Sequence, residues 1–333
     1  MTDAVDGKIL RALQCAPRAS FRLIGEVAGV SGRTAARRFH ALRQAGVGTS
    51  GWSASVDPAV HGDARWVARI RLPPRPGRPA RRRARPTTRH RLRGLASGGS
   101  EIICIITAPV HVPRDDVLLR QLPKSASVLD VSIDLLIHSF GTQGRSDWTG
   151  YGGHLTPGQV QHLVGDRPSA PAGPPVRLTD EDTPLLDALA EDGRATHTQL
   201  ADLTGWSTAR VARRLDALET SGALVYDVEL LSARLGFALN ATLWLRVAPA
   251  RLERVGEELA GHDEVAYAAA ISGDSNVMAI VVCRDTEDLY RYLTTKVAAV
   301  PGIDGYGVSI RVHTLKQATS LIARGRLVPP AFA

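Results

Sequence analysis

Apolar side chains recur at helical spacing in residues 182–223, and the spacing divides this stretch into three short helices. The apolar positions are Leu185, Leu186, Leu189, Leu200, Leu203, Val211, Leu215 and Leu218. Acidic residues 180–182 precede the first helix and suit the positive end of its dipole, Thr196 or Thr198 can cap the second, and Ser207 can cap the third. With Gly205 in the turn before the third helix, the pattern predicts a helix-turn-helix.

Beyond residue 231 the pattern changes to short apolar runs that alternate with amphipathic stretches. It predicts strand 240–247, helix 250–260, strand 265–272, strand 276–283, helix 286–299 and strand 304–314. This βαββαβ order is that of a ferredoxin-like fold. Because two helices cover only one face of such a sheet, we expect the other face to pack on a second unit.

The same series of patterns also occurs earlier in the chain. Segment 6–47 aligns with 182–223 at a shift of 176 residues, and the later strands align at a shift of 175. The identities include Asp6/Asp182, Arg18/Arg194, Ser31/Ser207, Arg37/Arg213 and Arg38/Arg214. The predicted fold class is therefore α+β, with two winged-helix-like helix-turn-helix domains and two ferredoxin-like βαββαβ sensing domains in tandem.

The repeat sets the expected domain boundaries. They are a helix-turn-helix at 1–50, a sensing domain at 51–140, a linker at 141–178, a second helix-turn-helix at 179–230 and a second sensing domain at 231–325. The linker is rich in Gly, Pro and Ser, with one short helix expected at 157–164. A linker of this length lets one chain pair its own two sensing sheets, so we expect an internal pseudo-dimer.

One stretch does not fit the repeat. Residues 75–96 stand where the second copy has a helix and a strand, yet they include nine arginines and three prolines. Three interpretations stay open: a basic tract that binds phosphates, a solvated insertion, or a segment translated in a shifted reading frame. We favour the shifted frame, because the length is kept while the composition is lost. As written, the first sensing domain is expected to be damaged there.

Charge and composition narrow the class of protein. Residues 1–100 carry 20 Lys and Arg against 5 Asp and Glu, which suggests a polyanionic partner. There is no apolar run of membrane-spanning length and no signal-peptide pattern, so we expect a cytoplasmic protein without membrane contact. Cys15, Cys104 and Cys283 are far apart and form no metal-binding motif, so neither a metal nor a cofactor is predicted.

The third helix of each copy has the chemistry expected of a nucleic-acid interface. Such a helix enters the major groove, where arginine suits guanine edges and phosphates, and hydroxyls suit phosphates and helix caps. The predicted DNA-binding residues are Ser31, Arg33, Thr34, Arg37, Arg38, Ser207, Thr208, Arg210, Arg213 and Arg214. The alternative is a solvated helix face, and the Arg-Arg pair kept in register in both copies argues against it. Which arginine reads a base stays open.

These motifs, in this order, resemble the Lrp/AsnC (leucine-responsive regulatory protein) family. The resemblance rests on segment 6–47, its counterpart 182–223, and the runs WLRVAP, SGDSNVMAIVV and VPGIDGYG of the second sensing domain. It implies double-stranded DNA as a partner, a small effector such as an amino acid, and self-association through the sensing domains. The implied effector-binding residues are Ser272, Gly273, Asp274, Ser275 and Asn276, although the same residue types suit an ordinary turn. The first copy lacks the aspartate, so we expect the effector site in the second.

The function that follows is a sequence-specific transcriptional regulator without catalytic residues, recognising two unlike half-sites. One alternative is an enzyme of similar architecture, such as a haem-pathway decarboxylase. His138 and His313 align in the repeat, but they are isolated, and no catalytic set accompanies them. Another alternative is a sensing scaffold without DNA binding, which the retained arginines disfavour.

Overall fold

The structure is a computed structural model. It describes residues 3–47, 53–56, 63–73, 90–109, 128–141, 148–165, 176–227, 230–317, 320–323 and 326–328. Its contacts divide the chain into two compact units. The helix-turn-helix unit contains residues 1–61, 149–235 and 325–333, and the sheet unit contains 62–148 and 236–324. Each unit therefore combines matching parts of both sequence copies.

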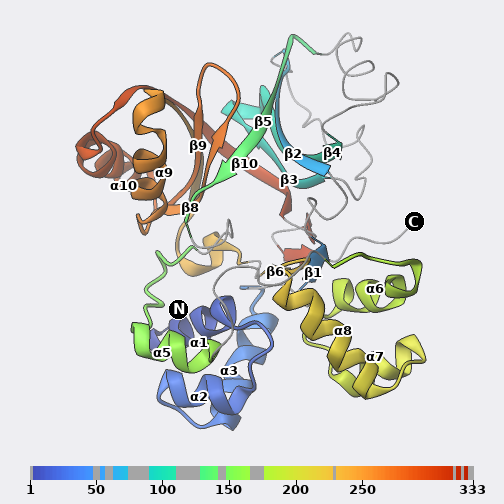
Figure 1. Cartoon of the computed structure of the whole chain (residues 1–333). Coiled ribbons are helices and arrows are strands. Elements are labelled where there is room, and N and C mark those ends of the chain that lie inside the picture. Colours follow the sequence, from blue (N-terminus) through green and yellow to red (C-terminus); the bar gives the residue numbers. More distant parts are fainter. Residues whose placement is uncertain are drawn as a thin grey trace. The chain divides into compact units, whose positions relative to one another are not determined.

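The first copy forms the three predicted helices α1 (Ala4–Cys15), α2 (Phe21–Ala28) and α3 (Gly32–Gln44) (Figure 1). The hydroxyl of Ser20 caps α2 and that of Ser31 caps α3, by accepting backbone N–H bonds. Gly29 ends α2 in the left-handed region at φ 76°, which glycine adopts without a Cβ penalty.

The second copy repeats this arrangement with η4 (Asp180–Asp182), α6 (Thr183–Glu191), α7 (His197–Thr204) and α8 (Thr208–Thr220). Thr196 caps α7 in a capping box with Gln199, which decides between the two threonines that the sequence offered. The predicted linker helix is present as α5 (Pro157–Val164), and its Leu163 packs into the core of the first copy.

The strand that follows each helix-turn-helix pairs with its counterpart from the other copy. β1 (Ser53–Val56) and β6 (Leu224–Asp227) form a two-stranded antiparallel sheet, with Ser53 opposite Asp227 and Val56 opposite Leu224. The backbone N–H of Leu231 also donates to the carbonyl of Val47 at 2.8 Å. The two helix-turn-helix domains are thus joined through main-chain bonds.

In the sheet unit, the second copy has the predicted βαββαβ order. Its elements are β7 (Leu239–Val247), η6 (Pro249–Arg251) with α9 (Leu252–Ala260), β8 (Val265–Ile271), β9 (Val277–Cys283), α10 (Thr286–Tyr292) with η7 (Leu293–Val297), and β10 (Ile303–Gln317). The strand order β10-β7-β9-β8 is that of the ferredoxin-like fold. The smaller elements of the chain are η2 (Ser97–Gly99), η5 (Ser232–Leu235), β11 (Ser320–Ala323) and β12 (Arg326–Val328).

The first copy builds an equivalent sheet despite its unusual composition. β2 (Asp63–Arg71), β3 (His90–Ala96), β4 (Glu101–Pro109) and β5 (Asp130–Ser139) lie in the order β5-β2-β4-β3. The strand expected at the end of the arginine-rich stretch is therefore formed. Residues 74–89, where the prediction of a distorted helix falls, lie outside the described residues.

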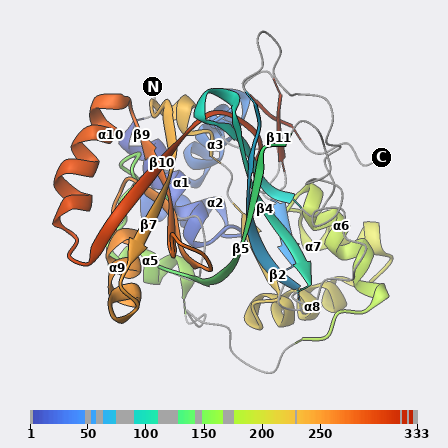
Figure 2. The same ribbon diagram turned by 90° about the horizontal axis from the view of Figure 1, so that it is seen from above.

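The two sheets join edge to edge, as the internal pseudo-dimer predicted. β10 pairs with β3, and β5 pairs with β8, so the last strand of each copy extends the sheet of the other. Because β10 also pairs with β7, the strands close into a ring in the order β7-β10-β3-β4-β2-β5-β8-β9. Figure 2 shows the two sheets facing each other, with α9 and α10 outside the second.

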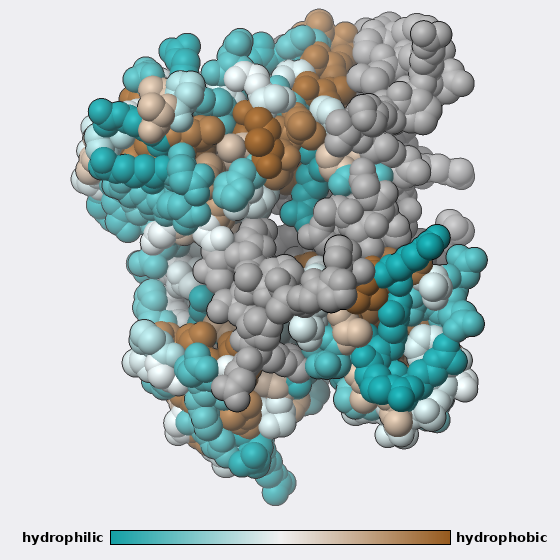
Figure 3. Space-filling model, viewed as in Figure 1, coloured by the Kyte–Doolittle hydropathy of each residue, from teal (hydrophilic) through white to brown (hydrophobic). Residues whose placement is uncertain are grey.

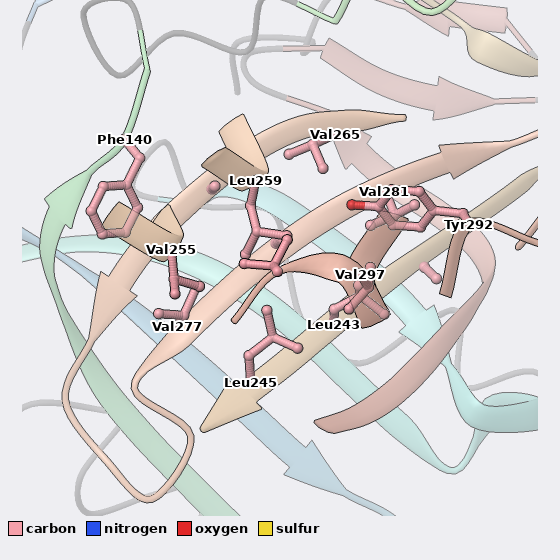
Figure 4. Close-up of a cluster of buried hydrophobic side chains, with 14 of the residues drawn as sticks. Phe140, Leu243, Leu245, Val255, Leu259, Val265, Val277, Val281, Tyr292 and Val297 are labelled. Carbon is pink, nitrogen blue, oxygen red and sulfur yellow. The ribbon is translucent and has the colours of Figure 1, made fainter. Parts of the chain in front are cut away.

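Apolar side chains fill both faces of the second sheet. On the outer face, Val255 and Leu259 of α9 pack on Leu243, Leu245 and neighbouring strand residues (Figure 4). On the inner face, residues of both copies form a shared core. This agrees with the expectation that the sheet face left uncovered by the two helices packs on a second unit. The shared core contains Val67, Ala96, Ile103, Ile105, Trp244, Ala269, Ile271 and Met278. Within the described parts of the chain, every helix is too short or too polar to span a lipid bilayer.

Candidate nucleic-acid interface and ligand cavity

The start of each third helix is fixed by its capping serine. Ser31 Oγ accepts from Thr34 N–H at 3.1 Å and donates to Thr34 Oγ1 at 2.9 Å, whereas Ser207 Oγ accepts from Arg210 N–H at 3.2 Å. Three predicted DNA-binding residues, Ser31, Thr34 and Ser207, therefore make bonds within their own helix start. Thr208 opens α8 and is exposed.

The Arg-Arg pair of each copy divides into two roles. Arg37 and Arg213 are exposed, and within the described part of the chain neither makes a hydrogen bond or an ion pair. Arg38 instead bonds Asp3 at 2.7 Å and Asp6 at 2.9 Å, and Arg214 holds both carboxylate oxygens of Asp182. Arg38 and Arg214 thus tie the third helix to the first.

Burial strengthens the pair in the second copy. The side chain of Asp182 is 3% exposed, and Arg214 approaches it at 2.7 and 2.5 Å. Burial by itself raises the pKa of Asp182, but the bonds from Arg214 and Thr179 outweigh burial and hold that pKa below its usual value. The carboxylate therefore stays ionised and fixes the orientation of α8.

The two remaining predicted arginines, Arg33 and Arg210, differ in their surroundings. Arg33 is exposed on the first turn of α3. Arg210 lies over the ring of Trp206 at 4.0 Å and pairs with Glu181 at 2.5 Å, so its guanidinium is held in place at the surface. The surface of α7 and α8 is mainly hydrophilic in the view of Figure 3.

A cavity of about 710 Å³ opens between the two halves of the sheet unit. It is lined by Arg69, Arg71, Leu72, Ser97, Ser100, Glu101, Leu129, Trp244, Arg246, Asp274, Ser275, Gly305, Tyr306, Gly307, Val308 and Ser309. Both sequence copies contribute, and the volume is within the range usual for small-molecule sites.

The predicted effector loop only partly faces this cavity. Asp274 and Ser275 line it. Ser272 instead exchanges two 2.8 Å bonds with the backbone of Leu135, and the side chain of Asn276 holds both backbone groups of Val247. Gly273 has φ +124°, and a Cβ there would lie 2.4 Å from Asp134 Oδ1. Three of the five residues therefore shape the loop.

The cavity wall contains a charged cluster that the sequence analysis missed. Nε of Arg69 donates to Glu101 Oε1 at 2.9 Å, and Nη2 lies 2.9 Å from the same oxygen in an ion pair. Ser97 donates to Glu101 Oε2 at 3.0 Å. Burial raises the pKa of Glu101, but the hydrogen bond with Ser309 and the charge of Arg69 outweigh it and keep that pKa below its usual value. The sequence signal that could have revealed this cluster is Glu101 itself, a charged residue at an inward-facing position of an otherwise apolar strand.

The cluster also spans the two copies. The Arg69 guanidinium lies 4.1 Å from the ring centre of Trp244, whose Nε1 donates to Ser309 Oγ at 2.9 Å. By the repeat register, Arg69 and Trp244 occupy the same position in the two copies, as do Arg71 and Arg246. Arg71 and Arg246 are exposed at the cavity, and among the described residues no carboxylate pairs with either.

His138 is not isolated in the folded chain. It lies with Glu253 and Glu257 of α9, with potential ligand atoms within 4.8 Å of one another, and all three side chains are exposed. Glu257 also accepts from the N–H of Gly141 at 3.3 Å. The side chain of His313 lies outside the described residues.

Comparison with known protein families identifies both kinds of domain. An AsnC-type helix-turn-helix domain matches residues 3–43 and 178–219, and an Lrp/AsnC ligand binding domain matches residues 240–321. The fold and these matches define a transcriptional regulator that joins DNA-binding to ligand-binding domains. The chain belongs to the Lrp/AsnC family in a tandem two-unit form, which confirms the resemblance seen in the sequence.

Two curated relatives each match less than half of this chain over nearly their whole length. The HTH-type transcriptional regulator LrpA of Pyrococcus abyssi is 29% identical over 140 residues, which are 42% of this chain and 99% of LrpA. The regulator FL11 of Pyrococcus horikoshii is 23% identical over 147 residues, or 44% of this chain and 97% of FL11. Each relative thus has the length of one unit.

Among solved structures, the siroheme decarboxylase NirDL is similar over both copies. Its TM-score is 0.64 at 12% sequence identity, covering 94% of this chain and 93% of that chain. At this identity the likeness concerns the fold alone.

Proposed function

We propose that this chain is a cytoplasmic transcriptional regulator that reads double-stranded DNA with α3 and α8 and responds to a small zwitterionic effector. We infer the DNA contact from the different surroundings of the two arginines in each Arg-Arg pair. Arg37 and Arg213 are exposed at the same register, while Arg38 and Arg214 anchor their helices. The proposal assigns direct contacts to Arg33, Arg37, Arg210 and Arg213. It assigns positioning to the anchored pair.

The DNA contact is tested by selecting duplexes from a random pool with the full chain and measuring affinity at several salt concentrations. Each arginine that reads a base contributes about 1–3 kcal/mol. Replacing both Arg37→Ala and Arg213→Ala should therefore weaken binding to the selected duplex at least about 30-fold. Arg254→Ala, an exposed change on α9, is the matched control. Equal affinity of the double variant and the control would contradict the proposal.

For the effector, the cavity offers charges of both signs. Asp274 suits an ammonium group, and Arg71 or Arg246 suits a carboxylate. An α-amino acid carries both groups on one carbon. The proposal therefore places an amino acid or a similar zwitterion against Asp274 and Ser275, with the first copy supplying the opposite wall.

Thermal unfolding in the presence of each common amino acid tests the effector. A ligand at about 100 times its Kd stabilises the folded state by about 2.7 kcal/mol. Asp274→Asn and Arg246→Gln should each remove the shift produced by the active amino acid, whereas the exposed change Glu253→Gln should keep it. A shift that survives both cavity variants would place the ligand elsewhere.

A second candidate function is enzymatic. NirDL is a siroheme decarboxylase, and a second structure of it holds an iron-uroporphyrin III analogue. The cavity here also presents arginines that could bind acidic side groups. Titration with iron-uroporphyrin III, followed by its absorption spectrum and product analysis, separates the two. Spectral binding with loss of carboxyl groups would favour the enzyme over the regulator.

A further inference from the structure

We infer that Arg18 and Arg194 form a reciprocal clasp that fixes the two recognition helices at one separation, and so sets the spacing of the two half-sites on DNA. The inference rests on the proposed DNA binding for its functional consequence. The clasp itself is a feature of the helix-turn-helix unit alone.

The two arginines occupy the same position of the repeat and reach in opposite directions. Arg18, after α1, donates from Nη1 to the carbonyl of Gly193 at 2.7 Å and from Nη2 to that of Ala195 at 2.9 Å. Arg194, after α6, donates to the carbonyl of Pro17 and, at 2.7 Å, to that of Ala19. Each guanidinium thus holds the turn that contains the other.

The bonded carbonyls explain why arginine stands there. They belong to the turns that follow the first helix of each copy, where helix geometry supplies no backbone partner for them. Gly193 and Ala195 are buried, so these carbonyls have little access to water. The planar fork of an arginine can satisfy two carbonyls together, whereas a lysine ammonium cannot span both with the same geometry.

The clasp is largely removed from solvent. Burial, followed by the charge of Arg18, lowers the pKa of Arg194 to about 10. Arg194 lies over the ring of Phe21 at 4.8 Å, and Glu219 approaches Nε of Arg18 at 3.9 Å. Two like charges are therefore held together by carbonyls, an aromatic face and one carboxylate. Such an arrangement is stable only while the two turns stay in contact.

The geometry links the clasp to the recognition helices. Glu219 belongs to α8, and Phe21 begins α2, which packs against α3 through contacts such as that of Phe21 with Phe39 at 5.3 Å. The second junction is the pairing of β1 with β6, whose Tyr226 donates a hydrogen bond to the same Glu219 at 2.5 Å. The two helix-turn-helix domains are consequently joined at two places, and a pair joined at two places cannot rotate about a single hinge.

The double variant Arg18→Lys with Arg194→Lys keeps both charges and removes the fork. The first measurement needs no DNA: spin labels at Ala41→Cys on α3 and Asp216→Cys on α8, in a Cys15→Ser background, report the separation of the recognition helices by pulsed dipolar spectroscopy. We expect one narrow distance distribution in the parent, broadened at least about twofold in the double variant. Arg22→Lys, an exposed pair with Glu26, should leave the distribution narrow. An unchanged distribution in the double variant overturns the clasp.

The second measurement uses the duplex selected with the parent chain, into which 2 or 5 base pairs are inserted between the half-sites. A 5-base-pair insertion turns one half-site by roughly half a helical turn. The parent should lose at least about 30-fold in affinity, and the double variant less than about 5-fold, with equal binding to a single half-site. Equal spacing dependence in both proteins overturns the inference. Absence of any selected duplex instead refutes the proposed function, and the distance measurement still decides the clasp.

Discussion

The two sequence copies keep more of their paired contacts in the helix-turn-helix unit than in the sheet unit. Asp6/Asp182, Arg18/Arg194, Ser31/Ser207, Arg37/Arg213 and Arg38/Arg214 keep their identity, and the members of each pair make corresponding contacts where contacts are present. At equivalent positions of the sheets stand Arg69 and Trp244, Glu101 and Asn276, Asp134 and Ser309. The anchoring contacts of the helix-turn-helix unit thus stay nearly two-fold, whereas those of the sheet unit do not.

This difference indicates what tandem fusion permits. In a pair of identical units, Arg69 would face a second arginine in the shared core. In the fused chain it faces Trp244, with its charge compensated by Glu101. Complementary differences therefore favour pairing of the first sheet with the second over pairing of either with itself.

The largest expected effect comes from placing a second arginine opposite Arg69, as in a pair of identical units. Trp244→Arg removes a side chain that is 3% exposed and puts a second guanidinium against Arg69. The loss of aromatic burial together with charge repulsion should destabilise the sheet unit by about 4 kcal/mol or more. Hydrogen exchange of the β7 and β10 amides measures this loss. Tyr306→Arg, at an exposed cavity position, should cost less than about 0.5 kcal/mol.

Removing the charge of Glu101 should have the next largest effect. Glu101→Gln leaves Arg69 without its anion and should cost about 3 kcal/mol in urea unfolding at neutral pH. Because the folded pKa of Glu101 lies below its unfolded value of 4.5, the contribution of its charge is full above pH 4.5 and is lost as pH falls through the folded pKa. Parent and variant should therefore converge in acid. A constant difference down to pH 2 would count against this assignment.

Neighbouring arginines of α8 should separate the stability of the second helix-turn-helix from the proposed DNA affinity. Arg214→Ala leaves the buried Asp182 unpaired and should destabilise the second helix-turn-helix by about 2 kcal/mol. Arg213→Ala should leave its stability within about 0.5 kcal/mol, yet weaken DNA binding about 10-fold. Thermal unfolding and DNA affinity are measured for both variants, and each variant serves as the control for the other. Equal effects of both changes in both assays would refute the division of roles.

The smallest expected effect concerns Asp134, which stands opposite the effector loop. Burial, and more weakly Asp274, raise its pKa, although Ser132 and Arg69 act in the other direction. A raised folded pKa means that stability falls as pH rises from the unfolded value of 3.8 through the folded value. Asp134→Asn should therefore stabilise the sheet unit slightly at pH 7, by about 0.5 kcal/mol, and not at pH 3. Unfolding curves at the two pH values test the sign.

The sequence went far toward the fold because its signals are local and appear twice. Helix caps such as Ser31 and Ser207, glycine turns and short apolar runs placed the elements within a few residues. The candidate DNA residues were found as a group for the same reason. The division between Arg37 and Arg38 could not be found, because it depends on Asp3 and Asp6, which lie on a different helix.

By itself, then, the sequence determined the repeat, the order of elements and the helix that carries the candidate recognition residues, since these follow from propensities within one turn or one strand. The tertiary structure alone decided which parts of the two copies meet. It brought Arg69 to Trp244 and Arg18 to the turn before α7, each across about 175 positions, and Glu101 to Arg69 across 32. Contacts at such separations depend on strand pairing and burial, which no local pattern encodes.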